Sequence, residues 1–271
     1  MIKINYSDLD KNYFPNNEFK FIIPYKNWWK EEEVHTIEWI FENNEEIFLI
    51  QMLKKYLDDK LYGKNIKCEL FVPFLPYGQQ DRPIKGQLFS FKYFSKIIND
   101  MKFTKVTFYD PHSIVMQACI NNAEVYYLEP MKDYDLVFYP DNGACKKYSE
   151  IYENLPYRFG NKKRNLDTGE IIKYEVIGER SDFEGKEILI IDDLCMGGRT
   201  FKEASLALYE MGAKCVDLQI THFMPNSVDF LKHYKDYGIK SIYTYIEGIS
   251  SIPLSLLDNE EKANIHDACI L

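Results

Sequence analysis

The segment with the clearest chemical potential joins two acids, two glycines and a helix start behind an apolar run. Asp192 and Asp193 follow the apolar residues 188–191, and Gly197 and Gly198 come shortly after them. Adjacent carboxylates suit the two vicinal hydroxyls of a ribose, which are paired donors. Glycines let backbone N–H groups approach a phosphate, and a helix that begins near residue 200 adds its positive dipole end. The spacing predicts a ribose-phosphate site, and a strand–turn–helix with solvated acids is the alternative interpretation.

Alternating strand and helix patterns surround this segment and would position it. The periodicity predicts strands at 34–41, 70–74, 105–109, 134–139, 187–191 and 215–220. It predicts helices after a capping Asn44, over 90–101, and over 201–211 with Gly212 as the C-cap. Such alternation favours an α/β fold with mainly parallel sheets flanked by helices, in which ligands bind beyond the carboxyl ends of the strands.

The length and one polar segment predict two domains. A chain of 271 residues is long enough for about two domains of ordinary size. The polar stretch 129–133, which contains Pro130, separates one α/β unit from the next. We therefore place the boundary near residue 130, which gives domains over 1–130 and 131–271.

Composition excludes several classes of function. The formal net charge of −9 argues against a general nucleic-acid binder, and 46% hydrophobic with 28% charged residues is typical of a globular protein. No stretch approaches the ~20 apolar residues that span a bilayer, and the polar N-terminus does not resemble a secretory signal. We therefore expect a cytoplasmic protein with no membrane or nucleic-acid partner. The six cysteines form no C-x-x-C pair, which predicts buried apolar side chains rather than a zinc site.

The acid and glycine segment and five further segments resemble those of a known family. The stretch 192–200 resembles the phosphoribosyl-diphosphate-binding motif of the phosphoribosyltransferase fold. Other segments resemble those of ribose-phosphate pyrophosphokinases (PRPP synthases) and follow in the same order, from about residue 13: 13–18, 76–82, 109–113, 139–144 and 161–164. The resemblance implies two tandem phosphoribosyltransferase-like α/β domains, the first of them diverged.

The resemblance also implies a reaction and a set of roles. Such enzymes transfer the β,γ-diphosphate of ATP to the anomeric hydroxyl of ribose 5-phosphate, with Mg²⁺ and cationic side chains neutralising the converging charge. By this likeness, Lys162 and Arg164 are catalytic residues on a mobile loop, and His112 and Asp141 are linked to the metal.

Substrate-binding residues follow from the same resemblance. It assigns ATP to His112 and to two segments, namely Phe14, Asn16 and Glu18, and Gln79, Gln80, Asp81 and Arg82. It assigns the ribose-phosphate acceptor to Asp192, Asp193, Cys195, Met196, Gly197, Gly198, Arg199 and Thr200. In the family the adenine-site residues reach a neighbouring subunit, which implies a homo-oligomer, a dimer or a hexamer, with shared sites.

The chain departs from the family pattern at both substrates. Gln79 stands where the family has an arginine that contacts ATP phosphate. In the acceptor loop, Met196, Gly197 and Arg199 stand where the family has an acid, a threonine and a glycine. A loop without the threonine hydroxyl and with an added arginine suits a phosphoryl group that continues into a diester, so ADP-ribose and ribose 5-phosphate both remain as acceptors. ADP-ribose pyrophosphokinases are relatives of the family, and their product would serve to rebuild NAD.

Two other functions share part of this pattern. A phosphoribosyltransferase that consumes PRPP would use the Asp192–Asp193 motif without the adenine segment or the Lys162 region. A non-catalytic partner of PRPP synthases would not need to retain His112, Asp141, Lys162 and Arg164.

Overall fold

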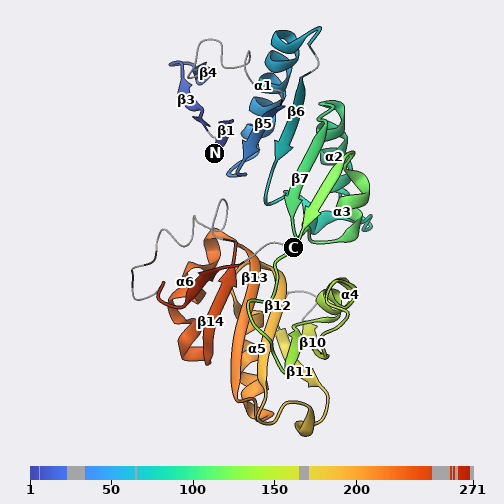
Figure 1. Ribbon diagram of the computed structural model, residues 1–271, viewed down its shortest axis with the longest axis vertical. Helices are drawn as coiled ribbons and strands as arrows, with labels where there is room; N and C mark the ends of the chain where they lie inside the picture. The colour runs from blue at the N-terminus through green and yellow to red at the C-terminus, as the bar shows by residue number, and fades with distance from the viewer. Residues whose placement is uncertain are drawn as a thin grey trace. The chain divides into compact units, whose positions relative to one another are not determined.

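The chain forms two compact units in a computed structural model, Met1–Tyr126 (unit 1) and Tyr127–Leu271 (unit 2). The structure describes residues 1–5, 7–22, 34–64, 66–164, 171–245, 257, 259 and 262–268. Each unit contains a mainly parallel sheet flanked by helices (Figure 1). The α/β fold class predicted from the sequence is confirmed.

Unit 1 contains a six-stranded sheet in the order β2-β1-β5-β6-β7-β8. Its strands are β1 (Ile2–Ile4), β2 (Ser7–Asp8), β5 (Val34–Trp39), β6 (Lys67–Phe71), β7 (Lys105–Tyr109) and β8 (Ala123–Tyr126). The strands from β5 to β8 are parallel, whereas β1 runs antiparallel to both of its neighbours. Its helices are α1 (Glu45–Leu61), α2 (Ser90–Asp100) and α3 (Ile114–Cys119), with a 3₁₀ turn, η2 (Gly78–Gln80). A separate antiparallel hairpin pairs β3 (Asp10–Tyr13) with β4 (Phe19–Ile22).

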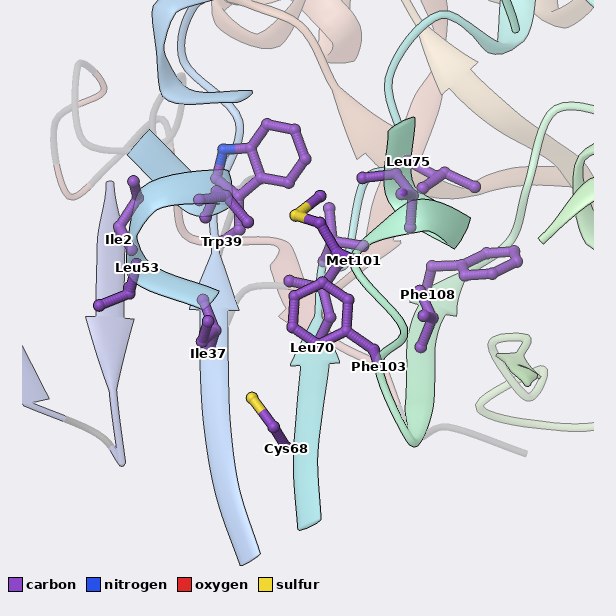
Figure 2. Close-up of a cluster of buried hydrophobic side chains, with 14 of the residues drawn as sticks. Ile2, Ile37, Trp39, Leu53, Cys68, Leu70, Leu75, Met101, Phe103 and Phe108 are labelled. Atoms are coloured by element: carbon purple, nitrogen blue, oxygen red, sulfur yellow. The ribbon is translucent and has the colours of Figure 1, made fainter. Parts of the chain in front are cut away.

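The hydrophobic core of unit 1 forms because alternate residues of each strand point to the same face of the sheet. Ile37, Leu70 and Phe108 on three neighbouring strands are fully buried, and Leu53 of α1 packs in the same cluster (Figure 2).

The predicted cap of helix α1 is wrong. Asn44 precedes α1 but has helical backbone angles and forms no side-chain cap, and its Oδ1 instead accepts a hydrogen bond from the Tyr77 hydroxyl at 2.5 Å.

Unit 2 contains a seven-stranded sheet in the order β11-β10-β9-β12-β13-β14-β15. Its strands are β9 (Leu136–Tyr139), β10 (Tyr157–Arg164), β11 (Ile171–Ile177), β12 (Glu187–Cys195), β13 (Cys215–Phe223), β14 (Ile239–Thr244) and β15 (Ile265–Asp267). The pair β10–β11 is antiparallel and the other pairs are parallel. The helices are α4 (Asn142–Ile151), α5 (Arg199–Glu210) and α6 (Val228–His233), with 3₁₀ turns η3 (Arg180–Asp182), η4 (Pro225–Ser227) and η5 (Tyr234–Tyr237).

Strand β12 lies in the interior of this sheet and is covered on both faces. Ile188 and Ile190 pack in the cluster that includes residues of α5, and Leu189 and Ile191 pack in the cluster that includes residues of α4. The continuous apolar run therefore has the cause expected for a buried parallel strand. Across the residues that the structure describes, no helix has both the length and the apolar character needed to cross a membrane.

Candidate active site

Side chains from three neighbouring strands meet at one edge of the unit 2 sheet. Asp141 follows β9 and is the N-cap of α4, where its Oδ1 accepts a hydrogen bond from the backbone N–H of Ala144 at 2.9 Å. Strands β10 and β12 flank β9 on either side and carry Lys162 and Asp192. Because all three strands are parallel, their carboxyl ends lie at the same edge, which is where ligands bind in α/β sheets.

The closest charged contact at this edge joins Asp141 to Lys162. The Lys162 Nζ lies 2.5 Å from Asp141 Oδ2, and the lysine side chain is only 11% exposed. Burial alone would raise the pKa of the Asp141 carboxyl, but the Lys162 charge and the amide hydrogen bonds outweigh it and hold that pKa below its usual range. Asp141 is therefore a carboxylate at neutral pH, and Lys162 is held within reach of it.

The position of Lys162 differs from the predicted loop. Strand β10 continues through Arg164, and Lys162 pairs in register with Tyr174 of β11. The antiparallel hairpin extends the strand, with a register irregularity between Lys163 and Arg164. Residues 165–170, which follow the predicted loop segment 161–164, lie outside the described residues.

The paired acids belong to strand β12 rather than following it. β12 runs to Cys195 because it pairs with β13 as far as Phe223. The backbone N–H of Asp193 donates to Asp192 Oδ1 at 3.0 Å, and the Lys147 Nζ of α4 lies 3.9 Å from Asp193 Oδ1. Burial, followed by the negative charges of Asp193 and Asp141, raises the pKa of Asp192 well above its usual value. The acids therefore share one electrostatic environment with the lysine of β10.

A short turn connects these acids to helix α5. Gly198 has φ +73°, and a Cβ at this position would lie 2.0 Å from the Phe230 side chain, so both conformation and space require glycine. A Cβ on Gly197 would meet no atom within 4 Å, and Met196 is 46% exposed. Helix α5 begins at Arg199, which is exposed, with Thr200 as its second residue. Position 198 of the turn therefore requires glycine, whereas position 197 borders open space.

Cys195 is separated from this open space. Its side chain is fully buried in the core cluster next to α5, and burial raises the pKa of its thiol. Of the predicted acceptor residues in this segment, Cys195 therefore offers only its backbone to a ligand.

The predicted adenine residues lie on a hairpin turn of unit 1. Phe14, Asn16 and Glu18 are exposed and connect β3 to β4. The Phe14 N–H donates to the Glu18 carbonyl at 2.8 Å, and the Asn17 N–H donates to the Phe14 carbonyl at 2.9 Å. The Asn16 Oδ1 accepts from the Glu18 N–H at 3.3 Å. The Lys20 Nζ lies 5.9 Å from the centroid of the Phe14 ring.

The other predicted ATP residues follow β6 and β7 of unit 1. Gln79 and Gln80 are exposed in η2, and the side chain of Gln80 accepts a hydrogen bond from Ser90. The guanidinium of Arg82 is 79% exposed and lies 3.9 Å from Asp81. His112 is exposed in the segment between β7 and α3. These residues thus belong to unit 1, and the Asp141 cluster belongs to unit 2.

One carboxylate of unit 2, that of Asp141, has the properties of a magnesium ligand. Among the described residues, no group of three or more His, Cys, Asp and Glu side chains is arranged to hold a metal. Mg²⁺ is usually bound through one or two carboxylates together with substrate phosphates, and Asp141 is ionised and partly exposed. Asp141 therefore has the chemistry of such a ligand.

Three residues of the site escaped the sequence analysis. Lys147 approaches Asp193 from α4, and the hydroxyl of Tyr174 donates to the Pro140 carbonyl at 3.0 Å. Gly160 makes room for that tyrosine, since a Cβ there would lie 2.2 Å from its hydroxyl oxygen. The one signal available was a glycine two residues before Lys162, directly before the segment 161–164 that was predicted to be a loop.

Known proteins resemble the chain in both sequence and fold. The ribose-phosphate pyrophosphokinase of Sulfurisphaera tokodaii is 26% identical over 259 residues, which cover 90% of this chain and 86% of the relative. That of Sulfolobus acidocaldarius is 30% identical over 193 residues, 66% of this chain and 64% of the relative, so this match spans less than two thirds of the relative's length. The fold resembles the crystal structure of phosphoribosylpyrophosphate synthetase from Mycobacterium smegmatis, with a TM-score of 0.68 at 18% identity over 96% of this chain and 85% of that one. No family model matches the chain.

Proposed function

We propose that the chain is a member of the ribose-phosphate pyrophosphokinase family and that it transfers the β,γ-diphosphate of ATP to the anomeric hydroxyl of a ribose 5-phosphoryl acceptor. The hydroxyl oxygen of the acceptor forms a bond to the β-phosphorus and releases its proton to solvent, the bond from that phosphorus to the α,β-bridging oxygen breaks, and AMP leaves. The observation that carries this proposal is the contact of Lys162 with Asp141, beside Asp192, at the carboxyl edge of the unit 2 sheet.

Each group at this edge has a task in such a transfer. Lys162 supplies positive charge close to a carboxylate and can neutralise the diphosphate as it leaves AMP, with Arg164 acting alongside it. Asp192 and Asp193 accept hydrogen bonds from the vicinal hydroxyls of the acceptor ribose. The turn 196–198 and the start of α5 offer backbone N–H groups to the acceptor phosphate.

ATP and magnesium complete the proposed site. Asp141 would hold Mg²⁺, which when bound neutralises the charge of the ATP phosphates. Phe14, Asn16 and Glu18 would bind adenine, and Gln79 to Arg82 would bind the rest of the nucleotide. Exposed side chains at these positions are consistent with binding a ligand or a neighbouring subunit.

For the acceptor we propose ADP-ribose, with ribose 5-phosphate as the competing candidate. Gly197 has open space where a side chain would lie, Met196 is partly exposed, and Arg199 is exposed at the first position of α5. Space and a planar cation suit a diphosphate that continues beyond the ribose, and Arg can bind its oxygens bidentately. The product would be ADP-ribose 1-diphosphate, a compound suited to NAD salvage.

A direct assay separates the candidate functions. The protein is incubated with ATP and Mg²⁺ and with either ADP-ribose or ribose 5-phosphate, while AMP release and product mass are followed. AMP release with either acceptor supports the diphosphokinase. Efficient turnover of ribose 5-phosphate with none of ADP-ribose would overturn the acceptor proposal alone. The absence of AMP with both acceptors would leave a phosphoribosyltransferase or a non-catalytic partner, of which PRPP consumption identifies the first.

We also propose a homo-oligomer in which Phe14, Asn16 and Glu18 complete the site of a neighbour. Their exposure on a separate hairpin supports this arrangement. Specific activity should then fall on dilution below the dissociation constant of the assembly, by mass action. A protein that is monomeric by light scattering and fully active would contradict it.

A further inference from the structure

Tyr174 has no part in the proposed chemistry, yet it reaches the site from the edge strand of unit 2. It lies on β11, and strand β10 separates β11 from β9. Its hydroxyl nevertheless donates to the carbonyl of Pro140, which directly follows β9, at 3.0 Å. The side chain therefore crosses a whole strand to contact the turn that carries Asp141.

Gly160 makes this crossing possible. A Cβ on this residue of β10 would lie 2.2 Å from the Tyr174 hydroxyl oxygen, 2.6 Å from the ring and 3.0 Å from the Pro140 carbonyl oxygen. The only way to keep the tyrosine and its hydrogen bond in place is a residue without a side chain here. Gly160 and Tyr174 thus depend on each other for the hydrogen bond from β11 across β10 to the turn after β9.

The same side chain also adjoins the lysine. Tyr174 pairs in register with Lys162, and residues directly opposite on antiparallel strands have Cβ atoms about 4.5–5.5 Å apart on one face. Two contacts thus fix the position of Asp141. Its carboxylate lies against the Lys162 ammonium, and the carbonyl of the preceding Pro140 accepts a hydrogen bond from Tyr174. Burial, then the charges of Asp141 and Asp192, raise the pKa of the phenol, so that it stays a neutral donor.

We propose that Tyr174 is a positioning residue that fixes the Pro140–Asp141 turn and thereby sets the separation of Asp141 from Lys162. This inference rests on the proposed function, because it assigns Tyr174 to the same site. A reacting geometry that loosens by about 1 Å can lose on the order of 100-fold in rate, so a single hydrogen bond on this turn is enough to matter.

The test compares two tyrosine variants that each lose one hydroxyl. Tyr174→Phe removes the bond to Pro140. Tyr209→Phe removes a bond of the same kind, from the Tyr209 hydroxyl to the Gly238 carbonyl at 2.7 Å, and this ring also packs against a glycine. For each variant kcat, the KM for ATP and the Mg²⁺ concentration at half-maximal rate are measured. Hydrogen exchange of the Ala144 amide and Mn²⁺ affinity without substrates are measured in parallel.

Tyr174→Phe should lower kcat about tenfold and raise the half-saturating Mg²⁺ concentration several-fold, with the KM for ATP unchanged. It should also speed Ala144 exchange and weaken Mn²⁺ binding, whereas Tyr209→Phe should leave all of these at wild-type values. Wild-type kcat and Mg²⁺ dependence in Tyr174→Phe would overturn the inference and leave a structural role. If the wild type releases no AMP with any acceptor, the proposed function fails, and Ala144 exchange and Mn²⁺ affinity still decide the inference.

Discussion

The two units hold their candidate residues in different ways. In unit 2, Asp141 and Asp192 lie on or directly after the buried strands β9 and β12, and both carboxyl groups interact with Lys162 of β10. In unit 1, the candidate residues lie on turns and are mostly exposed, with Arg82 at 79% and Phe14 at 47%. Rigid, preorganised groups are what a transition state requires, whereas exposed groups on turns suit a nucleotide that binds and leaves. The difference supports the proposal that unit 2 carries the chemistry and unit 1 the recognition of ATP.

The sharpest way to break this comparison is to remove the lysine of unit 2. Lys162→Ala should lower kcat on the order of 100-fold or more, because in the proposed reaction its charge acts on the diphosphate group while that group is transferred. Its control is Lys214→Ala, which removes an exposed ion pair with Glu187, 2.9 Å long, in the same unit. AMP release measures both variants, and near-wild-type turnover of Lys162→Ala would remove this residue from the mechanism. Arg164→Ala should behave like Lys162→Ala.

A glycine in each unit tests how tightly the two regions are packed. Gly198→Ala should destabilise unit 2 by about 2–3 kcal/mol, since it adds left-handed strain and a collision with Phe230. Gly86 of unit 1 has φ +81°, but a Cβ there would meet no atom within 4 Å. Gly86→Ala should therefore lower the free energy of unfolding by only about 1 kcal/mol. Urea denaturation measures both changes. Equal losses in the two variants would contradict a more tightly constrained turn in unit 2.

Arginine 82 tests the other half of the comparison. Arg82→Ala should raise the KM for ATP about tenfold, which corresponds to one lost contact to phosphate, while kcat falls much less. Because the side chain is 79% exposed, the free energy of unfolding should change by no more than about 0.5 kcal/mol. Steady-state kinetics with varied ATP and a denaturant titration give both values. A large fall in kcat at unchanged KM would move Arg82 from recognition to chemistry.

The sequence predicted the parts of this molecule that follow from local pattern. The parallel α/β fold, the strand at 105–109 and the glycine turn before α5 follow from periodicity and from the low cost of glycine at positive φ. Strand ends were less accurate, since β12 continues through both acids to Cys195, where pairing with β13 outweighs their polarity.

Contacts between distant residues were not predictable in this way. Asn44 was expected to cap α1, but the Tyr77 hydroxyl occupies its side chain. Nothing near Tyr174 in the sequence indicates that it would reach Pro140, because that contact depends on the order of three strands and on a glycine in the middle one. Long-range partners of this kind are set by topology, which periodicity does not encode.

The smallest expected effect concerns the stability of unit 2 and its dependence on pH. The folded-state pKa of Asp192 is raised, so the folded state favours the protonated acid, and stability is lost as the pH rises through that pKa. Asp192→Asn removes the charge, so this variant should be more stable than the wild type at pH 7, by roughly 1 kcal/mol or about 2–4 °C in Tm. The difference should shrink as the pH falls through the ordinary value of 3.8, below which both states of the wild type are mostly protonated.

A second acid of unit 2 provides the control with the opposite sign. Arg158 donates to Asp182 at 2.6 Å and holds the pKa of that carboxyl below its usual value. Asp182→Asn should therefore be less stable than the wild type at pH 7, and this loss should disappear as the pH falls below about 3.8. Melting curves from pH 3 to pH 8 on both variants decide the matter. An Asp192→Asn protein less stable than the wild type at pH 7 would mean that Lys162 and Lys147 already compensate its charge, and that the acids of unit 2 are held there without cost to the fold.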